Sequence, residues 1–202
     1  MVRLVRALVV VALVSALAAC DGTPEATPTA SPPTSTRSAS AAPGAFTAPP
    51  LRLPSGGRGE DCPVSRARPW SEPGRANRVL GPGPVYPIAD YFPDAALPLR
   101  DQDRHPDGSY TVKVRWLASG YTGPVLVRAG RIDGPGTAAV EFSYTGEPRD
   151  GGHYAELTDP DTDLPATTTV GGPGCYAYQV DGTTFSETIV FRTLTVVTPV
   201  SS

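Results

Sequence analysis

The sequence predicts an all-β domain over residues 61–202, and three observations lead to that prediction. Short runs rich in β-branched and aromatic residues alternate between apolar and polar side chains, as on strands with one face in a core. Gly, Pro and Asp separate these runs, and no long stretch keeps the 3.6-residue apolar period of a helix. Several short strands with such turns are typical of an antiparallel β-sandwich, and we expect the immunoglobulin-like type.

The clearest strand is S-Y-T-V-K-V-R-W-L at residues 109–117, where Tyr110, Val112, Val114 and Trp116 share one face. The other expected strands are residues 124–129, 137–144, 175–180 and 185–197. Residues 66–99 carry many prolines, which predicts a segment that either wraps a sheet edge or forms edge strands, since proline cannot donate to a ladder. Residues 150–174 predict either a long loop or a pair of irregular edge strands.

A terminal hairpin is expected where Asp181-Gly182 separates two alternating runs. The D-G pair readily adopts the positive φ of a type I′ turn, and a longer D-G-T-T connection is the alternative. Cys175 begins the first strand of this hairpin and shares its phase with Ala177 and Gln179 rather than with the bulky tyrosines. We therefore expect Cys175 at the rim of the sandwich.

Residues 1–19 have the pattern of a secretory signal peptide. Arg3 and Arg6 precede an uncharged apolar run from Ala7 to Leu17, which is too short for a comfortable membrane span. The following L-A-A-C, ending at Cys20, resembles the lipobox of bacterial lipoproteins. That resemblance implies diacylglyceryl transfer to the Cys20 sulfur, cleavage before Cys20, and export; the alternative is an ordinary signal peptide with an incidental cysteine.

Residues 20–60 are expected to form a disordered tether. They are dominated by Pro, Ser, Thr and Ala, and such a composition buries too little apolar surface to offset the entropy of ordering. A coil of this length spans on the order of 35 Å, enough to hold a domain away from a membrane. Glycosylation of its hydroxyl side chains remains open.

Two cysteines are left once Cys20 carries lipid. In an exported chain, Cys62 and Cys175 are best interpreted as one disulfide, which would fasten the start of the domain to a late strand. A reactive Cys175 would need a neighbouring base, and none is visible. A thiolate metal site would need closely spaced cysteines, which are missing.

Composition and motifs predict no catalytic residue, no cofactor and no metal ligand. The net charge of −3 comes without a basic stripe, so we do not expect a nucleic-acid partner. The loop Asp159–Asp163 begins like a calcium loop but lacks its glycine and its closing glutamate; an irregular ion site there remains open. His105 and His153 are both expected at the surface, without the partners of a hydrolytic triad.

Aromatic side chains are the remaining functional candidates. Trp116 and Tyr144 lie in apolar strand phase and are expected in the core. Tyr121, Tyr154 and one of Tyr176 or Tyr178 are expected at the surface, where tyrosines could bind a sugar or a peptide.

Several stretches together resemble a group of short lipoproteins and exported proteins of GC-rich Gram-positive bacteria. They are C-P-V at Cys62, G-P-G-P-V-Y at Gly81, V-R-W-L at Val114, G-P-V-L-V-R-A-G-R-I-D-G-P-G at Gly123 and G-C-Y-A-Y-Q-V-D-G-T-T-F-S-E-T-I-V-F at Gly174. The resemblance implies a lipid-anchored envelope protein with a β-sandwich, and it carries over no catalytic residue.

The sequence therefore predicts a non-catalytic binding or structural module, held on the outer face of the cell membrane by its lipid. The partner would be a cell-wall glycan or an envelope protein. Two alternatives remain: a small secreted cell-wall hydrolase using scattered acids or His153, and an accessory or sensor subunit that makes contact through Asp159–Asp163.

We expect Cys20→Ser to block lipid modification, because the thiol is the acceptor of the diacylglyceryl group. Mass spectrometry of the membrane fraction should detect lipidated protein from the natural sequence and only unprocessed precursor from the variant. An inhibitor of the lipoprotein signal peptidase should leave the natural chain uncleaved. Identical processing and fractionation of both chains would refute the lipid anchor.

Overall fold

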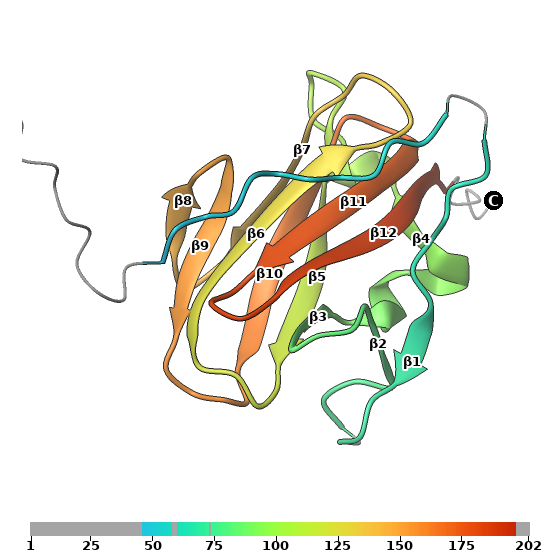
Figure 1. Ribbon diagram of the computed structural model, residues 1–202. Coiled ribbons are helices and arrows are strands. Elements are labelled where there is room, and N and C mark those ends of the chain that lie inside the picture. The colour runs from blue at the N-terminus through green and yellow to red at the C-terminus, as the bar shows by residue number, and fades with distance from the viewer. Residues whose placement is uncertain (1–45, 58–59, 73, 197–202) are drawn as a thin grey trace, which may run out of the picture. The chain divides into compact units, whose positions relative to one another are not determined.

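Two β-sheets pack face to face in the computed structural model, which describes residues 46–57, 60–72 and 74–196 (Figure 1). The predicted all-β sandwich is confirmed, and all pairings within the two sheets are antiparallel except that of β4 with β12. In the described part of the chain, no helix is long and apolar enough to span a membrane.

Strand order defines the two layers. The four-stranded sheet has the order β3 (Val85–Pro87), β5 (Tyr110–Ala118), β10 (Asp163–Val170), β7 (Ala138–Phe142). The six-stranded sheet has the order β4 (Ala96–Leu99), β12 (Ser186–Thr195), β11 (Gly174–Asp181), β6 (Gly123–Arg131), β9 (Gly152–Leu157), β8 (Glu147–Arg149). The remaining elements are a small hairpin and three short 3₁₀ turns: β1 (Ala67–Pro69), β2 (Arg78–Leu80), η1 (Ala89–Tyr91), η2 (Pro93–Ala95) and η3 (Asp101–Asp103).

The core lies between the sheets and is built from the alternating residues of both. On β5, Val114 and Trp116 are fully buried, as the strand's pattern predicts. The Trp116 ring meets Tyr178 of β11 edge-on at 4.9 Å between centroids, and Tyr178 stacks on Phe191 of β12 at 4.4 Å. Offset and edge-on aromatic pairs stabilise a core beyond their buried area, by about 0.5–1.5 kcal/mol each.

The prediction of a loop or edge strands over residues 150–174 is wrong, because β10 lies between β5 and β7 inside its sheet. Its inward residues include Thr168, whose hydroxyl is hydrogen-bonded to the Tyr178 hydroxyl at 2.8 Å. Because this threonine is buried with its hydroxyl paired, the sequence of β10 is more polar than expected for an interior strand. Pro165 is tolerated because it lies where β7 has ended, and its carbonyl accepts the Ser143 amide.

The terminal hairpin is confirmed, but its turn is not the D-G type I′ turn. Asp181 pairs with Ser186, and the Gly182 amide donates to the Phe185 carbonyl at 2.9 Å, so the tip lies at Thr183 and Thr184. Asp181 is the last residue of the first strand, and its buried carboxylate forms an ion pair with Arg128 of the neighbouring strand β6.

Residues 46–57, expected in the tether, instead lie against the outer face of the six-stranded sheet; we call them the strap. Figure 1 shows the strap crossing β9, β6 and β11. The Gly56 amide donates to the Ile132 carbonyl at 2.8 Å, and Leu53 packs with Ile132 and Ala177. The expected boundary at residue 60 therefore differs from the structure, since Leu53 and the strap's backbone groups find partners that composition does not show. Residues 1–45 lie outside the described part of the chain.

The predicted disulfide joins Cys62 to Cys175, with 5.6 Å between their Cα atoms. Cys175 is on the outer face of the six-stranded sheet, beneath the segment that continues the strap, rather than at the rim. The same segment then follows β12, where the Ser65 amide donates to the Val190 carbonyl at 2.9 Å. The bond therefore fixes the chain that covers β11.

Removing the disulfide should destabilise the domain, because the bond closes a loop with a sequence separation of 113. For a loop of this size, chain entropy contributes about 4–5 kcal/mol to the free energy of unfolding. We expect that loss in urea denaturation of Cys62→Ala/Cys175→Ala, and a matching loss when the natural protein is reduced. A decrease below about 1 kcal/mol would contradict the assigned role.

Candidate functional site: the free edge of strand β7

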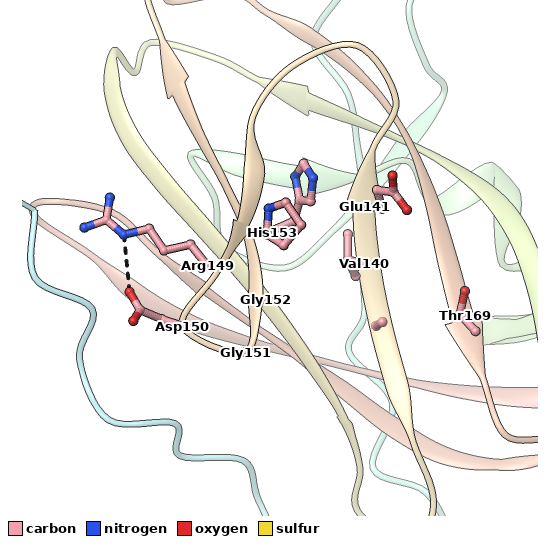
Figure 2. Close-up of a pocket in the computed structure, with 10 residues that line it drawn as sticks. Val140, Glu141, Arg149, Asp150, Gly151, Gly152, His153 and Thr169 are labelled. Carbon is pink, nitrogen blue, oxygen red and sulfur yellow. Dashed lines mark ion pairs between the residues drawn. The ribbon is translucent and has the colours of Figure 1, made fainter. Parts of the chain in front are cut away.

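A groove of about 540 Å³ runs along the edge of the four-stranded sheet. It is lined by residues 139–141 of β7, residues 148–153 of the β8–β9 hairpin, and Thr169 of β10. Figure 2 shows β7 with Val140 and Glu141 between the hairpin, which carries Arg149 to His153, and the strand with Thr169. The groove therefore lies between the β7 edge of the four-stranded sheet and the β8–β9 hairpin at the end of the six-stranded sheet.

The backbone of β7 presents unpaired hydrogen-bonding groups to this groove. Ser143 donates to the Pro165 carbonyl, and the Thr137 carbonyl accepts the Gly171 amide, so odd-numbered residues pair with β10. Because backbone groups of an antiparallel strand alternate in direction, those of Val140 point away from β10. Among the described residues, the Val140 amide and carbonyl have no strand partner.

His153 closes one end of this free edge. Its side chain is 5 % exposed, so the expectation of a surface histidine is wrong: residues 153, 155 and 157 are the inward-facing set of β9. The Phe142 amide donates to His153 Nδ1 at 3.4 Å, and the two rings meet edge-on at 5.5 Å. Burial lowers the pKa of His153, and Glu141 opposes this shift. A neutral imidazole therefore caps one edge amide and leaves Val140 free.

The groove carries a small excess of negative charge. Glu141 is exposed on β7, whereas Asp150 is paired with Arg149 at 3.4 Å. The Arg149 guanidinium also lies over the Tyr154 ring, 4.5 Å from its centroid, and donates to the Phe46 carbonyl at 3.3 Å. One carboxylate, that of Glu141, thus stays available for a basic ligand group beside the unpaired backbone of β7.

This arrangement can bind an extended peptide by adding a strand to β7. Main-chain hydrogen bonds supply affinity in that mode, and side-chain contacts on the groove walls supply specificity. It is less suited to nucleophilic hydrolysis, which requires a hydroxyl or thiol hydrogen-bonded to the base. In the structure's described residues, the hydrogen-bond partner of His153 is the Phe142 amide.

His153, named from sequence as a candidate of the hydrolase alternative, lines this groove, whereas the predicted disulfide and the Asp159–Asp163 loop lie elsewhere. Cys20 falls outside the described residues, and the Cys62–Cys175 disulfide lies on the other sheet. In the Asp159–Asp163 loop, Asp159 accepts the Asp161 amide at 2.9 Å, and Asp163 forms an ion pair with Arg115. Within residues 46–57, 60–72 and 74–196, no group of three or more His, Cys, Asp or Glu side chains is placed to hold a metal ion.

The predicted placement of the aromatic side chains is partly wrong. Trp116 is in the core as expected, but Tyr144 is 88 % exposed because β7 ends at Phe142. Tyr121, Tyr176 and Tyr178 are all buried, so they form no surface platform. Only Tyr154 of the expected surface set is partly exposed, and Arg149 and Phe46 cover it.

Sequence reasoning missed the free edge of β7, since no local pattern shows which strand ends a sheet. The run 137–144 and the Gly, Pro and Asp residues after it indicate a strand followed by a turn, but not the place of that strand in its sheet.

The buried His153 predicts a loss of stability at mildly acidic pH. Its pKa is lower in the folded than in the unfolded chain, so the unfolded chain binds the proton first. The contribution of neutral His153 to the free energy of unfolding is complete at a pH above the ordinary histidine pKa of about 6.5. It decreases as the pH falls below that pKa toward the lower pKa of the folded chain. His153→Gln keeps an acceptor for Phe142 but cannot titrate. Urea denaturation between pH 7.5 and 5 should show a shallower decrease for this variant; equal slopes would contradict the assignment.

No family model and no curated protein matches the sequence, and no solved structure matches the fold. The function is therefore inferred from the site and from the sequence patterns described above.

Proposed function

We propose that this protein is a lipid-anchored, non-catalytic binding module on the outer face of the cell membrane. It binds an extended segment of an envelope protein by adding that segment to the free edge of β7. The observation that carries this proposal is the unpaired Val140 backbone, which faces a groove large enough for a peptide. The lipobox-like L-A-A-C and the resemblance to envelope lipoproteins support the anchored location.

The expected ligand carries a basic side chain. Glu141 projects beside the free edge without an ion-pair partner among the described residues, whereas Arg149 is already engaged by Asp150 and the Tyr154 ring. A Lys or Arg in the added strand would lie close to Glu141. Such complementary charge favours association and sets the register of the bound strand.

Two features support an immunoglobulin-like type for the sandwich. Taken in chain order as strands A to G, β3, β5, β6, β7, β10, β11 and β12 give the sheets A-B-E-D and G-F-C of the constant-type fold. At the start of β11, the buried Tyr176 hydroxyl donates to the Gly172 carbonyl at 2.9 Å. This bond corresponds to the tyrosine corner at the start of strand F. The β8–β9 hairpin and β4 are additions to that pattern.

A cell-wall glycan is a second candidate ligand, favoured by a groove of about 640 Å³ bordered by η1, η3 and β5. There Tyr91 lies among side chains that can hydrogen-bond sugar hydroxyls, including Asp90, Gln102, Lys113 and Thr167. Glycan binding in this groove would leave the β7 edge unaffected.

Binding at β7 should slow exchange of the Val140 amide, which has no strand partner in the free domain. We expect a basic strand-forming probe, an alternating Val-Lys hexapeptide, to protect this amide in NMR-detected hydrogen exchange. Ala139→Trp should weaken binding of the probe at least tenfold, since Ala139 is exposed on the groove wall and a bulky side chain blocks it. This factor corresponds to about 1.4 kcal/mol.

Thr188→Trp is the matched control, because Thr188 is exposed on β12 of the other sheet. Its affinity for the probe should equal that of the natural domain. Soluble peptidoglycan fragments form a separate arm: they should shift Tyr91 resonances but leave Val140 unprotected. Failure of the peptide to protect Val140, or equal binding by the two tryptophan variants, would overturn strand addition at β7.

A further inference from the structure

The outer face of β6 and β11 carries buried charged and polar side chains that contact the strap. Asp181 is fully buried and accepts hydrogen bonds from Arg128 at 2.6 Å, Gln179 at 3.0 Å and the Ser186 hydroxyl at 2.6 Å. Arg128 and Gln179 are 5 % and 2 % exposed. On an uncovered sheet face these side chains would be solvated; here the strap removes them from water.

These side chains bind main-chain atoms of the strap. The Gln179 amide donates to the Pro50 carbonyl at 3.1 Å and accepts the Arg52 amide at 2.6 Å. Arg128 donates to the Pro49 carbonyl at 2.7 Å. Three backbone groups of a proline-containing segment are thus bound by two side chains, and Asp181 accepts a hydrogen bond from each of these side chains.

Apolar contacts with the strap are few. Leu53 is half-buried, and Phe46 is half-buried against Tyr154 with 5.9 Å between ring centroids. Leu51 is 49 % exposed. Burying an ion pair costs desolvation free energy that apolar packing would avoid. This face of β6 and β11 therefore binds the strap mainly through hydrogen bonds to the strap's main chain, and less through apolar packing.

We infer that this face is a peptide-recognition site for a proline-containing extended segment, with the chain's own strap as its resident ligand. The same site accepts the strap of a second copy when its own strap leaves. Two observations make exchange feasible. Gly56 and Gly57 end the strap, and the Cys62–Cys175 bond downstream keeps the rest of the chain in place.

The test supplies the strap on a separate chain while keeping the whole protein. A protease recognition sequence is inserted between Gly57 and Glu60, and the purified protein is cleaved there. We expect the upstream fragment to remain bound through size-exclusion chromatography. A fluorescein-labelled peptide of residues 46–57, added in excess, should then replace it, as measured by fluorescence anisotropy.

The peptide itself provides the sharpest variants, because it leaves the domain unaltered. N-methylation of the Arg52 nitrogen removes the donor to Gln179, and we expect about tenfold weaker binding. N-methylation of the Leu51 nitrogen is the control; this residue is exposed and its amide has no partner among the described residues. On the domain, Gln179→Ala should weaken binding, whereas Thr188→Ala, its neighbour on β12, should not.

The expected result is retention of the cleaved fragment, exchange with the labelled peptide, and discrimination between the two methylated peptides. Loss of the fragment from a domain that stays folded by circular dichroism, together with no binding of the labelled peptide, would overturn the inference. Equal binding of the two methylated peptides would also overturn it, since the site would then not recognise the backbone. Arg149 lines the β7 groove and also contacts Phe46 of the strap, but neither Gln179 nor Arg52 lines that groove, so the variants used in this test leave it unaltered.

Discussion

The burial of strand β11 on both faces is the constraint on which the rest of the structure depends. Tyr176 and Tyr178 of β11 face the sandwich core. On the other face of the strand, Cys175, Ala177 and Asp181 are buried on the side covered by the strap and by the segment that continues it to Cys62. A central strand of a sandwich normally has one wet face, with polar residues alternating outward. Here the outward residues can be small, apolar or charged only because the strap and the disulfide cover them.

This constraint divides the molecule into two unlike surfaces. The chain's own residues cover the outer face of the six-stranded sheet over β6 and β11, whereas the four-stranded sheet ends in β7 with unpaired backbone groups. Exposed edges invite pairing with other chains, and proteins usually protect them. His153 accepts the hydrogen bond of one β7 amide, that of Phe142. The β8–β9 hairpin lies beside β7, so the part of the β7 edge that stays open is the groove at Val140.

The sequence allowed the sandwich, the main strands and the cysteine pair to be predicted, because each leaves a local signal. Alternation placed Trp116 in the core, and the cysteine count of a chain expected to be exported paired Cys62 with Cys175. The errors share one cause: burial by segments far away in sequence. Thr168 on β10 and Asp181 on β11 look solvent-facing in the sequence, but Tyr178 is the partner of Thr168, and Arg128, Gln179 and Ser186 are the partners of Asp181. The free edge of β7 depends on strand order, which no window of sequence contains.

The disulfide also determines how the domain would carry mechanical load. A pull applied between the N-terminal segment and the C-terminal strand first strips the hydrogen bonds of the strap, one after another. At Cys62 the load passes through the covalent bond to Cys175 and on into the β11–β12 hairpin. The part of the chain between the two cysteines, which includes β7 and its groove, bears no tension as long as the bond is intact.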